Sequence, residues 1–173
     1  MRDTDVSRVR SVQGVAWAVP LFWTVQQARM HDGSFKPVQI VGIDSTTMIG
    51  RPVHMTAGKL EDLRLPNTVI IDDLAVERLS RGRAKKIGIG DTFEINDKEA
   101  RIVGTCISEK SFFGYPYVFT TYDQALQFAP KLRKMLSFIL AKPAPGWTAE
   151  QAVAQIKKET RLGAYTEKQF SRS

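Results

Sequence analysis

The chain has 173 residues, of which 43% are hydrophobic, and a net charge of +7. This composition supports a folded core and, with no low-complexity tract, argues against intrinsic disorder. The longest apolar run, residues 15–23, contains Pro20 and is far shorter than the roughly 20 residues that cross a bilayer. No apolar leader follows Met1, so we expect no signal peptide and no membrane span in this sequence.

The positive charge leaves three classes of surface open. It fits an ordinary basic surface, a nucleic-acid-binding surface, or a surface that lies next to an anionic membrane. No zinc-ligand spacing, RNA-binding signature or clear helix-turn-helix accompanies the charge, so nucleic acid is the weaker alternative. The basic residues are spread out except for one modest cluster, at Arg78, Arg81, Arg83, Lys85 and Lys86.

The first quarter of the chain predicts a helix followed by a hairpin. Residues 4–12 have apolar positions at helical spacing behind a Thr or Asp cap, and Gly14 ends the helix. Residues 15–30 form the first long strand, with apolar side chains of one parity from Val15 to Val25. After a turn at 31–34, residues 36–44 complete a long antiparallel hairpin.

The middle of the chain is rich in turns and short strands. Residues 47–65 carry several Gly and Pro residues and are expected to be irregular. Asp72 or Asp73 caps the next helix. The expected elements that follow are strand 68–72, helix 74–80, a hairpin of 91–96 and 99–107 with its turn at Asn96–Lys98, strand 117–121 and helix 122–128.

The last part of the chain contains the clearest helix. Residues 136–141 predict a buried strand, and Pro and Gly then form a turn. Thr148 caps a helix over 149–160 whose apolar residues share one face, and Gly163 ends it. A final short strand is expected at 164–165.

The order of these elements indicates an α+β fold with an insert. Residues 48–117 have more turns and shorter strands than the sequence on either side. We therefore expect an α+β lobe made from both chain ends, residues 1–47 plus 118–173, interrupted by a small β-rich lobe at 48–117.

The chain lacks the residue groupings that catalysis and metal binding require. His31 and His54 have no Cys, Asp or Glu neighbour at ligand spacing, and a metal site needs three or four donors. Cys106 lies in an apolar strand, where a thiol packs as a small hydrophobic side chain. The glycine-rich loop 82–90 is followed by Asp91 where a phosphate-binding loop has lysine. The sequence therefore predicts no catalytic residue, no cofactor and no metal.

One aromatic segment is a candidate contact surface. Residues 111–117 read SFFGYPY, and aromatic side chains that flank Gly and Pro in a loop are enriched at protein interfaces when they are exposed. The alternative is that they fill the core beneath the middle lobe, and the pattern does not decide between the two. The candidate partner-binding residues are Phe112, Phe113, Tyr115 and Tyr117.

Several stretches, in one order along nearly the whole chain, resemble a single family. They are VRSVQGV at 9–15, VQIVGID at 38–44, GKLEDL at 58–63, VIIDDLAVERL at 69–79, IGDTFEI at 89–95, ARIVG at 100–104, YVFTTYDQA at 117–125 and the closing residues 167–173. Together they resemble the extracytoplasmic domain of MacB/FtsX-like ABC transporter permeases, in particular the smaller DevC-like members.

The resemblance implies a two-lobed domain, with a porter-like α/β lobe and a small β-rich lobe. It also implies that the full-length protein lies in the cell inner membrane, with this segment periplasmic. ATP hydrolysis then belongs to a separate ATP-binding subunit. The implied partners are that subunit, a membrane-fusion adaptor protein and a second permease copy, with no nucleic acid. On this interpretation the chain is an excised segment between two membrane helices; a stand-alone nucleic-acid-binding domain and an unrecognised enzyme remain the alternatives.

Overall fold

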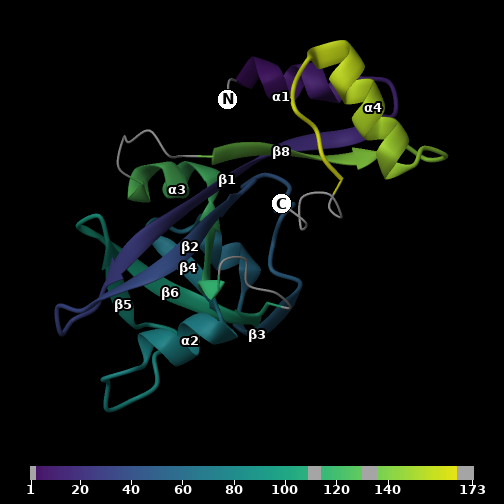
Figure 1. The fold of residues 1–173 in the computed structure, drawn as a ribbon. Coiled ribbons are helices and arrows are strands. Elements are labelled where there is room, and N and C mark those ends of the chain that lie inside the picture. The colour runs from purple at the N-terminus through teal and green to yellow at the C-terminus, as the bar shows by residue number, and fades with distance from the viewer. Residues whose placement is uncertain (1–2, 109–113, 130–135, 167–173) are drawn as a thin grey trace. The chain divides into compact units, whose positions relative to one another are not determined.

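The structure is a computed structural model that describes residues 3–108, 114–129 and 136–166 (Figure 1). It has an α+β fold, as the sequence predicts, and no helix in these ranges is long and apolar enough to cross a membrane. The chain forms two compact units. We call residues 21–137 the barrel unit, and we call residues 1–20 together with 138–173, which are the two chain ends, the end unit.

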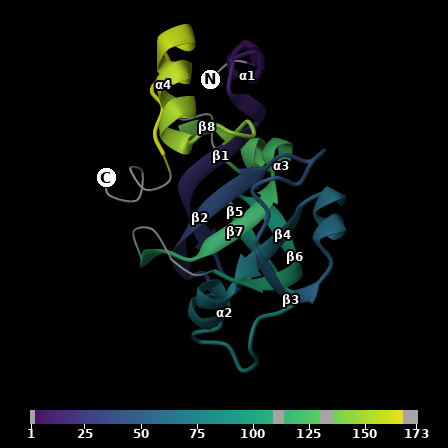
Figure 2. The same cartoon turned by 90° about the vertical axis from the view of Figure 1, so that its right-hand side faces the viewer.

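Six strands of the barrel unit pair in a closed ring among the described residues (Figures 1 and 2). β1 pairs with β2, β2 with β7, β7 with β4, β4 with β6, β6 with β5, and β5 again with β1. The β2–β7 and β4–β6 pairs are parallel and the others antiparallel. The strand bounds are β1 Val15–Arg29, β2 Phe35–Ile43, β4 Thr68–Asp72, β5 Thr92–Ile95, β6 Lys98–Ile107 and β7 Tyr117–Thr121.

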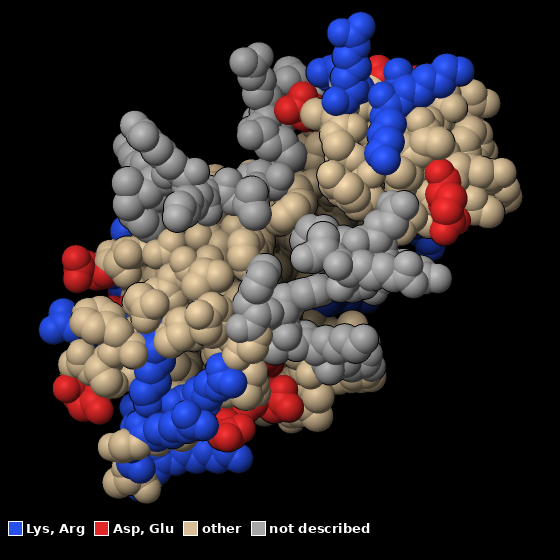
Figure 3. Space-filling model, in the orientation of Figure 1, with Lys and Arg blue, Asp and Glu red and all other residues tan. Residues whose placement is uncertain are grey.

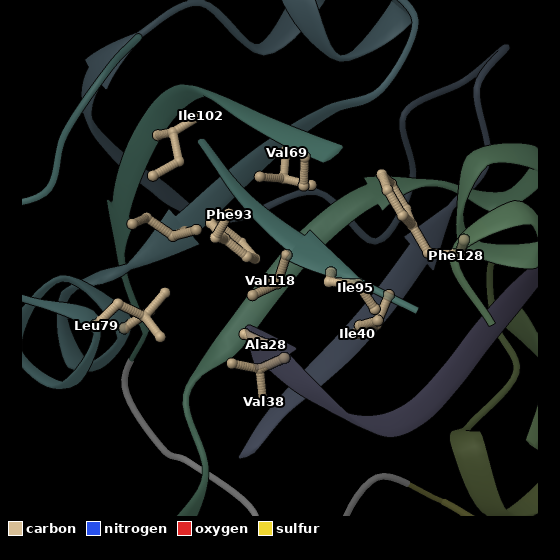
Figure 4. Close-up of a cluster of buried hydrophobic side chains, with 14 of the residues drawn as sticks. Ala28, Val38, Ile40, Val69, Leu79, Phe93, Ile95, Ile102, Val118 and Phe128 are labelled. Atoms are coloured by element: carbon tan, nitrogen blue, oxygen red, sulfur yellow. The ribbon is translucent and has the colours of Figure 1, made fainter. Parts of the chain in front are cut away.

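The inside of this ring is filled by alternate side chains of its strands (Figure 4). Phe22 and Phe93 are the largest, and their exposed fractions are 0% and 1%. Because a strand turns successive side chains to opposite faces, each strand contributes every second residue to this core. Further members from the strands are Ala28, Val38, Ile40, Val69, Ile71, Ile95, Ala100, Ile102 and Val118.

The opposite faces of four strands form a second core. Val41, Ile70 and Phe119 pack there with Leu63 from η1, a 3-10 helix at Leu60–Arg64. The short strand β3, His54–Gly58, pairs with β6 beside this cluster. A second hydrophobic layer outside the ring explains why β4 is buried on both faces.

Two short helices follow the ends of strands and are held by side-chain caps. α2, Asp73–Leu79, begins where Asp72 accepts a hydrogen bond from the Ala75 amide at 2.8 Å. α3, Tyr122–Phe128, is capped by Thr121 in the same way. Gly42 of β2 lets α3 approach closely, because a Cβ at this position would lie 2.6 Å from the Cβ of Ala125.

The end unit consists of two helices on a strand pair. α1, Asp3–Arg10, contacts α4, Ala149–Thr160, and β8, Leu136–Pro143, pairs with β1. Figure 1 shows α1 in purple and α4 in yellow side by side. Val9, Val12, Ala18 and Ile156 are its buried apolar side chains in one cluster.

Most predicted elements are confirmed. The first hairpin, the β5–β6 hairpin with its left-handed turn at Asn96 and Asp97, and the Thr148 cap of α4 occur where the sequence places them. The α4 cap is a full capping box with Gln151. The strand over 117–121 and the helices at 73–79 and 122–128 also agree.

Four local predictions are wrong. β3 lies within the stretch predicted to be irregular, and residues 164–165 form no strand. The left-handed residue that ends α4 is Arg161, not Gly163. The described part of β8 that we expected to be buried, 138–141, is half-buried. In each case the local pattern did not show what packs on the segment.

The apolar parity of β1 also misleads. The run of apolar residues that share one parity is odd-numbered, yet the most buried side chains of β1 in the barrel are Phe22 and Ala28. Both faces of this strand are partly covered, so parity alone does not identify the inside. The two compact units divide the chain at 20/21 and 137/138. These limits differ from the predicted lobe boundaries, and the inserted lobe at 48–117 stays a prediction.

Candidate partner-binding surface

The structure places two of the four candidate aromatic residues. Phe112 and Phe113 lie outside the described residues. Tyr115 is half-buried just before β7, and Tyr117 is 8% exposed. The Tyr117 ring packs beside that of Phe119, with centroids 5.9 Å apart, in the outer core. Tyr117 thus packs in the outer core, while Tyr115 is accessible in part.

The segment that carries Tyr115 is fixed to β2 by one buried side chain. Gln39 is 0% exposed, and its Nε2 donates to the Tyr115 carbonyl at 2.8 Å. Its backbone amide donates to the Pro116 carbonyl at 2.7 Å, and its Oε1 accepts from Trp23 Nε1 at 3.0 Å. A buried amide with its donors and acceptors used rigidifies its surroundings. Gln39 therefore holds the C-terminal end of the aromatic segment in one conformation.

Helix α2 contacts Ser108 and Gly114, the described residues that flank 109–113. The Ser108 amide donates to Asp73 Oδ1 at 3.3 Å, at the beginning of α2. At the end of the helix, the Arg78 guanidinium donates to the Gly114 carbonyl. Lys36 in turn donates from Nζ to the carbonyls of Arg78 and Arg81, both at 2.8 Å, which satisfies the helix C-terminus. Ser108 and Gly114 are thus both hydrogen-bonded to α2.

Two exposed apolar side chains lie at the end of β6. Ile107, the last residue of β6, is 46% exposed. It pairs with His54 of β3, and the residue before His54, Val53, is 82% exposed. Large apolar side chains gathered at one place on a surface are typical of protein-binding sites. This supports the same region of the barrel unit as a contact surface.

The buried titratable groups nearby do not form a catalytic pair. Burial raises the pKa of Asp72 in spite of the hydrogen bond that it accepts from Ala75. Burial also raises the pKa of Cys106 to about 12, with further contributions from the charges of Asp72 and Asp73. A thiol with so high a pKa is protonated at neutral pH and is a poor nucleophile. Of the two caps that the sequence left open, Asp72 and Asp73, the structure shows Asp72.

One open hollow of about 660 Å³ lies beside α3. Two polar side chains of its lining, Gln124 and Arg64, make hydrogen bonds within the fold. Gln124 accepts from the Thr68 amide at 3.0 Å and donates to the carbonyls of Leu63 and Leu65. Arg64 donates from Nε to the Ser45 carbonyl at 3.2 Å. These contacts hold η1 and the start of β4 against α3, so the hollow is a product of packing between loops.

The structure also places the two histidines and the glycine-rich loop. His31 lies 3.3 Å from the Thr92 hydroxyl, and His54 is on β3. No group of His, Cys, Asp or Glu with metal-ligand geometry occurs within the described ranges. In the glycine-rich loop, the Asp91 carboxylate accepts from the Gly88 amide at 2.8 Å, and the Gly90 amide donates to Ile102. The loop is a turn that leads into β5, as its Asp91 indicated.

The family of the chain follows from a match that covers nearly all of it. The sequence profile described as "MacB-like periplasmic core domain" matches residues 1–159. The chain belongs to this family. It is therefore an extracytoplasmic domain of a MacB-like ABC transporter permease. A comparison of this chain with curated proteins found no match in sequence.

Solved structures share the fold of this MacB-like domain. The extracellular domain of the noncanonical ABC-type transporter YknZ from Gram-positive bacteria matches with a TM-score of 0.64 at 15% identity, over 91% of this chain and 83% of that one. The periplasmic region of MacB from Actinobacillus actinomycetemcomitans matches with 0.63 at 14% identity, over 91% and 73%. A domain of a Porphyromonas gingivalis protein described as a permease matches with 0.53 at 15% identity, over 88% and 68%. Because the sequence identities are so low, the likeness to these structures establishes the fold alone. None of these matches supports nucleic-acid binding.

Sequence reasoning missed two parts of this surface. Gln39, which fixes the aromatic segment, stands as a polar residue in the apolar strand VQIVGI. A buried amide in such a strand needs hydrogen-bond partners, and that is the signal that could have identified it. The exposed Val53 and Ile107 come together only through the β3–β6 pairing, for which the sequence held no separate signal.

Proposed function

We propose that this domain belongs to an ABC transporter permease subunit and transmits ATP-driven motion to substrate export or to a membrane-fusion adaptor. The observation that carries the proposal is the family match over residues 1–159. The full-length protein then lies in the cell inner membrane, pairs with an ATP-binding subunit and a second permease copy, and holds this domain outside the cytoplasm. The domain itself makes or breaks no bond.

The connection between the two units fits a part that passes on motion. Both chain ends belong to the end unit, so force from flanking membrane segments would enter there. β1 begins in the end unit and continues as one strand into the barrel unit, where it pairs with β2 and β5. A closed ring of strands with a filled interior deforms little, because packed interiors have low compressibility. The barrel unit can therefore move as one body.

The adaptor contact is proposed at the aromatic segment and the apolar residues at its base. In the full-length permease, F112A, F113A and Y115A together should weaken capture of the co-expressed adaptor by about tenfold or more, since aromatic anchors dominate interface energies. The matched control is Y165A, because Tyr165 is 68% exposed in the end unit. Unchanged capture by the triple variant, with a normal unfolding transition, would remove the segment from the interface.

The transmission of motion has its own test. Cys106 is buried with a raised pKa, so a label added to introduced cysteines will not react there. Spin labels at Lys85 and, in a second variant, at Lys158 report distances between the two permease copies. We expect both distances to shift when ATP binds to the full-length transporter. Identical distance distributions with and without ATP would contradict the mechanical role.

A further inference from the structure

A second surface of the barrel unit combines exposed cations with exposed apolar side chains. It lies where the tip of the β1–β2 hairpin meets the loop after α2. We call it the tip surface and define it by five exposed residues: Phe35, Arg81, Lys85, Lys86 and Ile89. Figure 3 shows Lys and Arg side chains gathered over the region that Figure 1 assigns to α2 and the loop that follows.

The two segments of the tip surface are held together by polar contacts. Lys36 Nζ donates to the carbonyls of Arg78 and Arg81, which joins the start of β2 to the end of α2. A Cβ added to Gly82 would lie 3.5 Å from Asp32 of the hairpin turn, so the two loops also come close there. Phe35 is therefore presented beside the basic loop and not on a separate part of the unit.

The basic loop has a fixed backbone. The Ile87 amide donates to the Ser80 hydroxyl at 2.9 Å, and the Ile87 side chain is 2% exposed in the barrel core. Asp91 accepts from the Gly88 amide and lies 3.6 Å from the Arg83 guanidinium. With Ile87 anchored inside, Lys85, Lys86 and Ile89 point to solvent. A surface held in place loses less entropy when it binds.

The charge of this loop is not neutralised within the described part of the chain. Residues 76–91 contain five basic residues and two acids. Glu77 pairs with Arg81 across an exposed i,i+4 contact, and Asp91 pairs with Arg83, which leaves Lys85 and Lys86 without an ion pair among the described residues. Exposed pairs of this kind are weak, so Arg81 also remains available to a partner.

Exposed apolar residues distinguish this surface from a purely electrostatic one. Phe35 is 62% exposed and Ile89 is 54% exposed. Aromatic and Arg residues are enriched at the centres of protein interfaces, and apolar contacts there add to charge complementarity. A nucleic acid binds a basic loop chiefly through its phosphates, so two exposed apolar side chains beside the cations favour a protein partner.

From these observations we propose that the tip surface binds an acidic segment of a partner protein, one that also carries exposed leucine-like side chains. The inference rests on the proposed function only in assigning that partner to the transporter assembly. The tip surface shares no residue with the aromatic segment, and a partner of opposite charge would dock there with a salt-dependent on-rate.

The test measures binding of a labelled peptide with alternating Glu and Leu to the 173-residue chain by fluorescence anisotropy. Binding at low salt should weaken by about tenfold or more in K85E/K86E, because each substitution replaces attraction with repulsion. I89S should weaken it by a few-fold without a change in charge. The matched controls are K157E/K158E, an exposed lysine pair on α4, and L126S, at an apolar residue of α3 that is 40% exposed.

Three outcomes would overturn the inference. The first is equal weakening by K85E/K86E and K157E/K158E, which would indicate attraction to net charge alone. The second is binding of single-stranded DNA or phosphatidylglycerol vesicles that depends on Lys85 and Lys86 while the peptide does not bind, which would assign the surface to nucleic acid or to a membrane. The third is undiminished adaptor capture by full-length K85E/K86E. If the wild-type permease captures no adaptor at all, the adaptor proposal fails and the peptide result alone decides the tip surface.

Discussion

The barrel unit and the end unit reach stability by different means. In the barrel unit the strand pairs close on themselves, and every strand of the ring contributes to one continuous core. The end unit has a two-strand layer whose buried apolar cluster is small: Val9, Val12, Ala18 and Ile156. A closed ring leaves no sheet edge, whereas a short layer must be fixed by caps and tight local contacts.

The two units also differ in the contacts that stabilise them. The end unit carries a capping box at Thr148, which is a local contact, and a tight contact between the Trp147 ring and Gly14, which joins the two chain ends. The barrel unit relies on side chains that are distant in sequence, such as Phe22 and Phe93. Substitutions should therefore cost most in the barrel, and in the end unit they should cost most at its few tight contacts.

The largest effect is expected for F22A. Phe22 is 0% exposed inside the ring, and its ring meets that of Tyr122 edge-on with centroids 6.1 Å apart. Its removal should lower the free energy of unfolding by about 3–5 kcal/mol through lost burial and a cavity. Urea denaturation followed by fluorescence measures this. The matching variant in the end unit, I156A, should lower the free energy of unfolding by less, about 2 kcal/mol. An equal or larger loss for I156A would contradict the claim that the barrel core contributes more to stability.

Much of this architecture could be predicted from local patterns. Caps, turns and amphipathic spacing gave both hairpins, α2, α3 and α4, because each depends on residues only a few positions apart. The parallel pairing of β2 with β7 joins residues 39 and 117, and no local pattern reports it. Ring closure follows from this pairing, so the sequence could not show which parity of β1 faces inward or how the chain divides into units.

The candidate site was predictable only in part for the same reason. The aromatic run drew attention to 112–117, but the burial of Tyr117 depends on Val41 and Phe119 of the outer core. The basic cluster was visible in the sequence, whereas the nearness of Phe35 to it depends on the Lys36 contacts with α2. Composition gave the residue types, and long-range packing selected which of them are accessible.

Tight glycine contacts sharpen the comparison between the units. Gly14 has φ +92°, and a Cβ there would lie 2.3 Å from the Trp147 ring. Gly33 in the barrel unit has a similar φ of +84° and no atom within 4 Å of an added Cβ. G33A should cost about 1–2 kcal/mol from backbone strain alone. G14A should cost about 1–3 kcal/mol more, because the ring must move. Equal melting temperatures for the two variants would show that the Trp147 ring moves aside without a cost in stability.

A smaller effect tests the polar contacts that hold η1 to the barrel. Q124A removes one hydrogen bond to the Thr68 amide and two to the carbonyls of Leu63 and Leu65. We expect a loss of about 2 kcal/mol, since a buried amide is left without its acceptor. The control Q127A, at an exposed position of the same helix, should change stability by less than about 0.5 kcal/mol.

The smallest effect is a pH dependence that comes from Asp72 of the barrel unit. Burial raises the pKa of Asp72 above the 3.8 of an exposed carboxyl group. Between the two pKa values the folded state binds more protons than the unfolded state, so the wild-type chain loses stability as the pH rises through the folded pKa. D72N cannot ionise and keeps an oxygen that can accept from Ala75. The stability of D72N relative to wild type should therefore increase from pH 3 to pH 7 in urea titrations. D73N, at an exposed neighbour, serves as the control, and a difference between D72N and wild type that stays constant over this range would show that burial does not disfavour the charged cap.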